Sequence, residues 1–225
     1  MSKPDVSIII RTLNEELYLS DLLNAIQKQK SGFSHEIVLI DSGSTDKTLA
    51  IANIFSCRIL HISREEFSFG RSLNLACEVA QGTYLALISG HCIPCDQYWL
   101  QNLIEPIAKG MVQYSYGHQV GGPQTYWSEC QIFAKYFPVQ SSIPQKGFYC
   151  NNANSAMLSE TWKRHKFNET LTGLEDMDLA KRLVAEHGRV GYIADASVYH
   201  LHHETWKQIQ RRFERESLAL QQICP

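Results

Sequence analysis

The chain has 225 residues, of which 44% are hydrophobic and 20% charged, a mixture that excludes wholesale disorder and low-complexity structure. Its 21 basic and 23 acidic side chains give a formal charge of -2, so it lacks the strongly basic character that nonspecific nucleic-acid binding requires. No apolar run approaches the ~20 residues needed to cross a bilayer, and the first residues lack the apolar stretch of a signal peptide. We therefore expect a cytoplasmic protein whose seven cysteines are reduced thiols.

The first half of the chain alternates short apolar runs with segments of helical spacing. Strands are predicted at residues 6–11, 36–41, 58–62 and 84–89. Solid apolar strands separated by helices predict a Rossmann-like, mostly parallel α/β sheet with helices on both faces. Sheets of this kind bind ligands beyond the carboxyl ends of their strands. The places to search are therefore residues 11–14, 41–46 and 89–94, which are rich in polar side chains.

The pattern is less regular after Pro94. Helices are predicted at residues 99–107, 127–136 and 175–186, a strand at 112–118, and an amphipathic helix within residues 204–225. The stretch from Gly121 to Cys150 is rich in aromatic residues, Gly, Pro and Gln, with no clean period. No linker is long enough to separate domains, so we predict a single domain. The chain stops at Cys224-Pro225, which fits a truncated end.

Asp41 ends the second predicted strand and is followed by the polar segment Ser42-Gly43-Ser44-Thr45-Asp46. A carboxylate in this position can accept hydrogen bonds from a nucleobase imide or a ribose hydroxyl. The same residues also suit an ordinary capped turn between strand and helix, with no ligand. The sequence leaves both interpretations open.

Histidines occur at two places that the predicted sheet could bring together. His91 follows the fourth predicted strand, where it can ligate a divalent metal or contact a phosphate. His200, His202 and His203 precede the last helix, and alternate residues of a strand share a face, so His200 and His202 can act together. A loop histidine with ordinary partners, and a surface group of histidines, are the alternatives.

Cys92 and Cys95 form a CxxC pair. A structural zinc site usually requires a second CxxC or a pair of histidines at fixed spacing, and the chain has no second CxxC. A redox pair would normally open a helix early in the fold. A thiol or zinc function is therefore the weaker interpretation of this segment.

Three carboxylates, Glu175, Asp176 and Asp178, stand at the start of a predicted helix. Acidic residues there interact favourably with the helix dipole, which is one explanation for them. A carboxylate on a rigid element that faces a substrate hydroxyl can also serve as a general base. Spacing alone does not decide between the two.

The order of four segments along the chain is more specific than any of them alone. VSIIIRTLNEE (6–16), IVLIDSGSTDKT (37–48), FGRSLNLACEVAQGTYLALIS (69–89) and GLEDMDLAKR (173–182) together resemble the inverting glycosyltransferases of family 2, which have the GT-A fold. The DSGSTD form, combined with the segment that begins at Phe69-Gly70-Arg71, is most similar to the rhamnosyltransferase-like branch. The resemblance covers about residues 5–205.

This resemblance implies roles for individual residues. Asp176 matches the general base, with Glu175 beside it, and His200 matches a histidine that holds the metal or the diphosphate. The donor nucleotide would be bound by Arg11, Thr12, Asn14, Glu15, Asp41, Ser42, Arg71, Asn74, Ser89 and Gly90. The sugar and acceptor region would include Asn152, Asn154 and Ser155. Residues of about 1–118 would then form the nucleotide-sugar-binding half, and about 119–205 the acceptor and catalytic half.

The chain departs from the family pattern after the fourth predicted strand. The family usually has Asp-x-Asp or a similar acidic motif there, whereas this chain has Ser89-Gly90-His91-Cys92. Aligned through Pro94, His91 takes the place of the metal-binding aspartate. Imidazole suits Mn²⁺ better than Mg²⁺, which prefers oxygen ligands. We expect a divalent metal at His91 and His200, with Mn²⁺ favoured; metal-independent transfer and an inactive enzyme are the alternatives.

The predicted function is that of an inverting, hexosyltransferase-type enzyme in bacterial cell-surface polysaccharide synthesis. Its partners would be a nucleotide-diphosphate sugar donor and a saccharide or lipid-linked saccharide acceptor, with no nucleic acid. It would work in the cytoplasm, including at the inner face of the membrane through peripheral association. A noncatalytic nucleotide-sugar-binding module is one alternative. A nucleotidyltransferase is another, but it would normally carry a Gly-rich, basic phosphate loop, which residues 11–15 are not.

Overall fold

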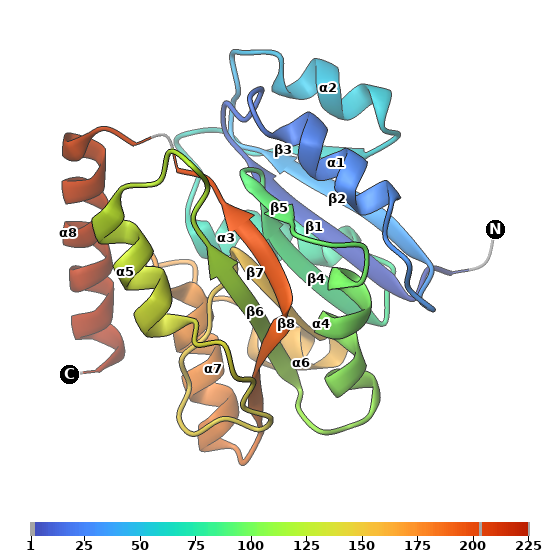
Figure 1. Cartoon of the computed structure of the whole chain (residues 1–225), viewed down its shortest axis with the longest axis vertical. Helices are drawn as coiled ribbons and strands as arrows, with labels where there is room; N and C mark the ends of the chain where they lie inside the picture. The colour runs from blue at the N-terminus through green and yellow to red at the C-terminus, as the bar shows by residue number, and fades with distance from the viewer. Residues whose placement is uncertain (1–2, 203, 225) are drawn as a thin grey trace.

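The computed structural model of this chain describes residues 3–202 and 204–224. Within these residues, eight strands form one sheet in the order β3-β2-β1-β4-β7-β6-β8-β5, seen across the middle of Figure 1. The strands are β1 (Val6–Thr12), β2 (His35–Asp41), β3 (Arg58–His61), β4 (Tyr84–Ser89), β5 (Cys92–Pro94), β6 (Tyr114–Val120), β7 (Asn154–Leu158) and β8 (Val190–His200).

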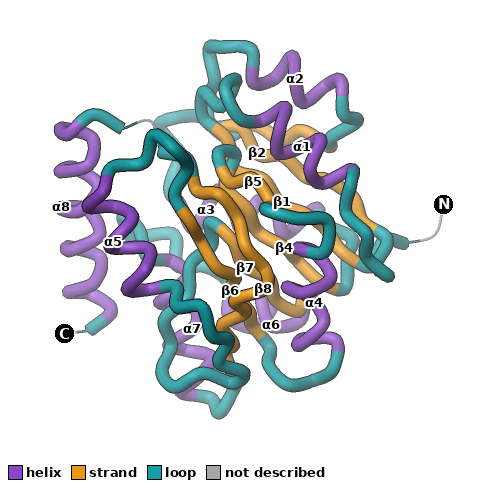
Figure 2. Tube along the Cα trace, viewed as in Figure 1, coloured by secondary structure: helices purple, strands orange, loops and turns teal. Residues whose placement is uncertain are grey.

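The helices of the described chain cover both faces of this sheet, as predicted (Figure 2). They are α1 (Leu19–Gln27), α2 (Thr48–Ile54), α3 (Phe69–Val79), α4 (Trp99–Ala108), α5 (Trp127–Tyr136), α6 (Ser159–His165), α7 (Glu175–Ala185) and α8 (Trp206–Ile223). Successive strand residues point to opposite faces, so Ile8 and Ile10 of β1 pack with α1 and α4, whereas Ile9 packs with α3 and α7. Residues on both faces are fully buried, which explains the continuous apolar run Ile8-Ile9-Ile10 of β1.

The first four strands form the parallel part of the sheet. β1 lies between β2 and β4 and is parallel to both, and β3 is parallel to β2. Thr12 is opposite Asp41 in this register, and Arg11 is opposite Ser89. The polar segments that follow β1, β2 and β4 therefore meet at one edge, which confirms the predicted arrangement.

The second half of the sheet is mixed, which the apolar pattern does not indicate. β7 is antiparallel to both β4 and β6, while β6 and β8 are parallel. Only two residues separate β5 from β4, yet β5 pairs antiparallel with β8 at the far end of the strand order. The sheet must curl for this to happen, and the curl sets Cys92 opposite His200.

The predicted C-terminal helix is present as α8, but most of its large apolar side chains do not face the core. Its apolar residues Trp206, Phe213 and Leu220 are 66%, 45% and 43% exposed, whereas Ala219 and Ile223 are buried. The side of α8 that faces the rest of the chain carries charged residues, which pair with charged groups of other elements. This explains why its apolar side chains are exposed. None of the described helices has the length and apolar character of a membrane span.

Candidate functional site

Two adjoining pockets open at the edge where β1, β2 and β4 end. The larger pocket includes Arg11, Asn14, Glu15, Phe69, Ser89, His91, Asn152, Glu175, Asp176, His200, His202, Arg212 and Arg215. The smaller pocket includes Arg11, Thr12, Leu13, Glu15, Ser42, Arg64, Phe67, Phe69, Ser89, His91 and Arg215. The predicted segments thus do come together, and α8, which is distant in sequence, contributes to both pockets.

The Asp41 carboxylate is bound by its own turn. Its Oδ2 accepts hydrogen bonds from the backbone N–H groups of Gly43 and Ser44, at 2.9 and 2.8 Å. Its Oδ1 accepts from the hydroxyls of Thr12, at 3.1 Å, and Ser44. Asp41 is only 1% exposed, and among the described residues that line the smaller pocket Ser42 is present while Asp41 is not. These hydrogen bonds are the ones expected of an ordinary capped turn between strand and helix.

The β1 and β2 turns are also tied to each other. The backbone N–H of Asn14 donates to Ser44 Oγ at 2.8 Å, and Asn14 Oδ1 accepts from the Thr45 N–H at 2.8 Å. The backbone N–H of Glu15 donates to Thr48 Oγ1 at 2.7 Å. Asn14 holds a left-handed backbone, with φ of 57°. The edge that borders both pockets is therefore fixed by hydrogen bonds that do not involve a ligand.

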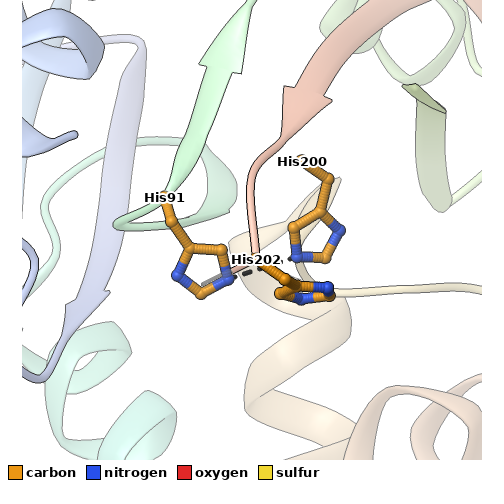
Figure 3. A group of neighbouring side chains, drawn as sticks. All are labelled: His91, His200 and His202. Carbon is orange, nitrogen blue, oxygen red and sulfur yellow. Dashed lines mark hydrogen bonds between the residues drawn. The ribbon is translucent and has the colours of Figure 1, made fainter. Parts of the chain in front are cut away.

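Three histidine rings face one another at the larger pocket (Figure 3). His91 follows β4, His200 ends β8 and His202 follows it, and the pairing of β5 with β8 brings them together. His91 Nε2 lies 3.2 Å from His200 Nε2, and the His200 and His202 ring centroids are 4.1 Å apart. Burial, with the charges of the neighbouring histidines, lowers the pKa of His200 well below its usual value. A neutral imidazole of this kind is ready to ligate a metal. His203 lies outside the described residues.

Each ring of this cluster is anchored through its other nitrogen. His91 Nδ1 lies 2.7 Å from Glu15 Oε1, and His200 Nδ1 lies 2.7 Å from Gln119 Oε1. His202 Nδ1 is bound to Glu129 Oε1. His202 was foreseen as a partner of His200 but not as a site residue. Gln119 and Glu129 carried no sequence signal, since they are single polar residues in the irregular half of the chain.

Asp176 and Glu175 form a buried acidic pair at the start of α7. They are 7% and 4% exposed. The Asn152 N–H donates to Asp176 Oδ2 at 2.8 Å, and the Met177 N–H donates to Oδ1 at 2.7 Å. Burial is the main cause that raises the pKa of Asp176 to about 7, and the neighbouring Glu175 charge adds to it. Asp178 instead pairs with Arg182 at 2.8 Å.

Two arginines meet over one aromatic ring between the pockets. The guanidinium carbons of Arg11 and Arg215 lie 4.5 and 4.4 Å from the Phe69 ring centroid. Arg11 Nη1 lies 3.5 Å from Glu175 Oε1, but neither this atom nor Arg215 Nε has a hydrogen-bond partner, although both are buried. Buried donors without partners are rare in proteins, so these atoms point to a missing acceptor. The resemblance did not indicate Phe69 or Arg215.

Several residues expected at the donor or acceptor lie outside the two pockets. Arg71 forms an exposed ion pair with Glu66 at 3.3 Å. Asn74 is held by Trp162 and the Phe167 backbone, and it fastens α3 to the segment after α6.

The remaining expected residues differ in their surroundings. Asn154 accepts from the Trp99 ring N–H at 2.8 Å and donates to two backbone carbonyls, so it is a structural residue. Ser155 donates to Asn152 Oδ1 at 2.9 Å and supports the residue that lines the pocket. Gly90 is required by close packing, because a Cβ there would lie 2.7 Å from Glu15 Cγ.

The CxxC pair does not form a thiol site. Cys92 is fully buried, and burial raises the pKa of its thiol well above the usual value. Both cysteines are free, and the groups of potential metal ligands found among the described residues contain histidine and glutamate but no cysteine. A buried neutral thiol is unreactive.

Comparison with known proteins identifies the family. The sequence model described as Glycosyl transferase family 2 matches residues 7–161, more than half of the chain. The chain belongs to this family. O-antigen chain rhamnosyltransferase RfbN of Salmonella typhimurium is 24% identical over 93% of this chain and 70% of its own length. WbaN of Salmonella anatum, described in the same way, is 26% identical over 94% of this chain and 71% of its own length.

Solved structures show the same fold. The mannosyltransferase PcManGT from Pyrobaculum calidifontis, in complex with GDP-Man and Mn²⁺, matches with a TM-score of 0.73 and 18% identity. The match covers 99% of this chain and 64% of that one, so the chain spans slightly less than two thirds of PcManGT. Glucosyl-3-phosphoglycerate synthase from Mycobacterium tuberculosis, with Mn²⁺, UDP and its product, matches with a TM-score of 0.72 and 18% identity, covering 98% and 80%. The GT-A fold predicted for this glycosyltransferase is confirmed.

Proposed function

We propose that this chain transfers a sugar from a nucleotide-diphosphate sugar to an acceptor hydroxyl, with inversion at the anomeric carbon. The single observation that carries the proposal is the buried Asp176 carboxyl in the larger pocket, whose pKa of about 7 suits a general base near neutral pH. Each of its oxygens accepts one backbone hydrogen bond, so each keeps a lone pair for a substrate hydroxyl. Glu175 keeps that pKa raised and interacts with Arg11.

The reaction is a single displacement. The Asp176 carboxylate removes the proton of the acceptor hydroxyl while its oxygen attacks the anomeric carbon, and the bond from that carbon to the diphosphate oxygen breaks. The transition state resembles an oxocarbenium ion, as in glycoside hydrolysis. One displacement inverts the configuration. Asn152 holds the base in place through its backbone N–H, which supports its assignment to the sugar and acceptor region.

The donor nucleotide is proposed to occupy the smaller pocket, against the edge formed by Arg11, Thr12 and Ser42. The turns after β1 and β2 are rigid without ligand, so this edge is preorganised. In this proposal Asp41 acts by holding the turn, since its oxygens already accept four hydrogen bonds. The diphosphate would lie where the pockets adjoin, near Ser89 and His91, which line both.

The chemistry of the donor set fits a divalent metal. His91 and His200 would hold the ion, and their two Nε2 atoms face each other at 3.2 Å. When bound, such an ion would neutralise the charge that grows on the diphosphate leaving group. Nitrogen ligands favour Mn²⁺ over Mg²⁺. Mn²⁺ in the PcManGT and glucosyl-3-phosphoglycerate synthase complexes supports a divalent metal here.

The relatives that match most of the chain are O-antigen chain rhamnosyltransferases. We therefore propose a role in bacterial cell-surface polysaccharide synthesis, with a rhamnosyl donor as the first to test. The acceptor would be a saccharide or a lipid-linked saccharide, and the protein would work in the cytoplasm at the inner face of the membrane. The replacement of the family's acidic ligand by His91 makes a noncatalytic binding module the second candidate, which would bind donor without turnover.

A donor screen tests this function. The purified chain is heated with a panel of nucleotide sugars, with and without Mn²⁺, because a bound donor raises the unfolding temperature by mass action. The donor that stabilises the chain is then incubated with saccharide acceptors, and the product's anomeric configuration is determined by NMR. Transfer with inversion is expected. Binding without transfer would support the noncatalytic module, and stabilisation by no nucleotide sugar would contradict both.

A further inference from the structure

The histidine cluster contains a third imidazole in addition to the two assigned to a metal above. One nitrogen of each of His91, His200 and His202 lies within 4.8 Å of one nitrogen of the other two. The rings come from two separate segments, and Figure 3 shows them grouped around a common point. His91 and His202 ring centroids are 5.3 Å apart, and those of His91 and His200 are 5.1 Å apart. All three therefore lie close enough to share one ion.

The anchoring bonds occupy the same atom of each ring and leave the other nitrogen available to a ligand. Nδ1 of each histidine meets a side-chain oxygen, from Glu15, Gln119 or Glu129. An oxygen acceptor at Nδ1 is satisfied by the Nδ1–H donor, so Nε2 is the ring nitrogen left to face a ligand. Histidines that ligate metals almost always donate their other nitrogen in this way. All three rings of the cluster are anchored in this way.

The spacing of the lone pairs also fits an ion. Two neutral imidazoles whose Nε2 lone pairs face each other repel unless a proton or a cation lies between them. With metal–nitrogen bonds of about 2.0–2.1 Å, two ligands of a tetrahedral ion are about 3.3–3.4 Å apart. His91 Nε2 and His200 Nε2 are 3.2 Å apart. The distance is close to the one that a shared ion imposes.

We propose that His202 is the third protein ligand, and that this three-imidazole site holds a resident zinc-class ion before any nucleotide binds, while excluding Mg²⁺. Three histidines with an open fourth position are a known catalytic zinc arrangement, and imidazole suits Zn²⁺ whereas Mg²⁺ requires oxygen ligands. The inference rests on the proposed function in one respect: the donor diphosphate would take the open position. The third imidazole extends the preference beyond Mn²⁺ to ions that bind nitrogen more strongly.

The C-terminal helix takes part in building this site. Arg212 of α8 donates to Glu129 Oε1, at 3.2 Å, and pairs with Glu204 at 2.8 Å. Glu129 of α5 in turn holds His202. The position of the third ligand thus depends on α5 and α8, whereas His91 and His200 are placed by the sheet. A substitution of Glu129 should therefore weaken binding of the ion without altering His91 or His200.

Metal binding without nucleotide tests the proposal. The metal-stripped chain is titrated with Zn²⁺, Mn²⁺ and Mg²⁺ by calorimetry, with no nucleotide and no acceptor present. One Zn²⁺ per chain is expected, with weaker Mn²⁺ binding and no Mg²⁺ binding, and the Co²⁺ form should show the visible absorption of a four-coordinate ion. Equal affinity for Mg²⁺ and Zn²⁺, or no binding of any transition ion without nucleotide, would overturn the proposal.

Variants assign the third ligand. His202→Ala should weaken Zn²⁺ binding by at least about 10-fold, and Glu129→Gln by about 10–100-fold, the range for loss of a residue that orients a ligand. His61→Ala is the matched control, because His61 is an exposed histidine at the end of β3. Thermal unfolding followed by circular dichroism verifies the fold of each variant. Wild-type Zn²⁺ affinity in both folded variants would overturn the role of His202. Since no sugar donor is used, this outcome is independent of the transfer assay.

A second, independent observation concerns the two unpartnered arginine atoms. Arg11 Nη1 and Arg215 Nε are buried without a hydrogen-bond acceptor, and both side chains line the two adjoining pockets. A buried charged donor without a hydrogen bond is costly, and Arg11 Nη1 has only the longer ion pair with Glu175 at 3.5 Å. An anion placed between the pockets would accept from both. Phosphate is an anion that arginine binds well, through paired N–H donors.

We infer that Arg215, contributed by α8, binds the donor diphosphate together with Arg11. Contact with the Phe69 ring restrains both guanidinium groups and so lowers the entropy lost on binding. Arg215 lies 204 positions after Arg11 in the sequence (215 − 11), so no local motif connects them. This inference also rests on the proposed function, since it names the group that holds the leaving diphosphate.

Binding of inorganic pyrophosphate tests Arg215. Its dissociation constant is measured by calorimetry, at fixed metal, for wild type, Arg215→Gln and the control Arg211→Gln, which alters an exposed arginine of the same helix. Arg215→Gln should weaken pyrophosphate by about 10–100-fold, the value of hydrogen bonds to charged groups, and Arg211→Gln should not. Adenosine and uridine, which lack phosphate, should bind both variants alike. Unchanged pyrophosphate affinity in folded Arg215→Gln, or no binding to wild type, would overturn the inference.

Discussion

Two buried aspartates at this pocket edge have opposite surroundings. Asp41 is 1% exposed and accepts four hydrogen bonds from its own turn and from Thr12. Asp176 is 7% exposed, accepts two backbone hydrogen bonds and stands beside Glu175. Burial and a neighbouring carboxylate raise the pKa of Asp176 to about 7. Two carboxylates of similar burial thus differ in how many hydrogen-bond donors surround them, and this difference is why we propose Asp176 rather than Asp41 as the general base.

The largest expected effect comes from Asp176→Asn, which keeps the shape and removes the basicity. Transfer should fall by about 10²-fold or more, the usual contribution of a general base. Nucleotide affinity should stay close to wild type, because Asp176 does not touch the proposed nucleotide pocket. Single-turnover rates and calorimetry measure the two quantities. Asp178→Asn is the matched control, since Asp178 is paired with Arg182; wild-type transfer by Asp176→Asn would remove Asp176 from the mechanism.

The same substitution should affect stability in a pH-dependent manner. The folded pKa of Asp176 is raised to about 7, above the unfolded value of about 3.9. Its contribution to stability is therefore fully present below about pH 4 and is lost as pH rises through about 7. As pH rises from about 4 to about 7, the free energy of unfolding of Asp176→Asn should therefore increase relative to that of wild type, by an amount on the order of a few kcal/mol. Denaturant unfolding at both pH values measures it, and a pH-independent difference would mean that the pKa is not raised.

Asp41→Asn should mainly affect stability rather than catalysis. Loss of the charged acceptor weakens four hydrogen bonds, so the free energy of unfolding should fall by about 1.5–3 kcal/mol. Nucleotide affinity should change only as far as the turn loosens. Chemical denaturation and calorimetry of the same sample separate the two effects. A loss of affinity of about 1.5–3 kcal/mol with unchanged stability would instead assign Asp41 a direct contact with the nucleobase.

The smallest effect is expected from Arg71→Gln. The resemblance places Arg71 near the donor, but the structure pairs it with Glu66 at the surface, where its side chain is 44% exposed. Exposed pairs contribute about 0–1 kcal/mol. Transfer rate and nucleotide affinity should therefore stay within about 2-fold of wild type. A larger loss of either would show that Arg71 moves to the donor during the reaction.

The parallel half of the fold was accessible from the sequence because its strands are continuous apolar runs and polar residues follow each of them. The regularity ends after β4. β5 has three residues, and β7 begins with the polar pair Asn154-Ser155, so neither carries a strand pattern. The antiparallel pairings that these strands make depend on contacts between distant segments, which periodicity does not encode.

The candidate site was predictable in the same uneven way. The resemblance points to Asp176, His91 and His200, and the structure places all three at the larger pocket. His202 contacts Glu129 of α5, and Arg215 belongs to α8. Their positions depend on how α5 and α8 pack, and no spacing rule links Glu129 to His202. The resemblance implies that Asn74 and Asn154 lie near the donor and the acceptor, yet in the structure both satisfy buried backbone and indole groups.

The pH dependence of transfer tests the central claim most directly. If Asp176 is the base, kcat/KM of wild type should fall as pH drops below about 7, because a protonated carboxyl cannot remove the proton of the attacking sugar hydroxyl. The residual activity of Asp176→Asn should lack this dependence. A wild-type profile that stays flat from pH 5 to pH 8, or an identical profile in Asp176→Asn at a rate close to wild type, would contradict the account.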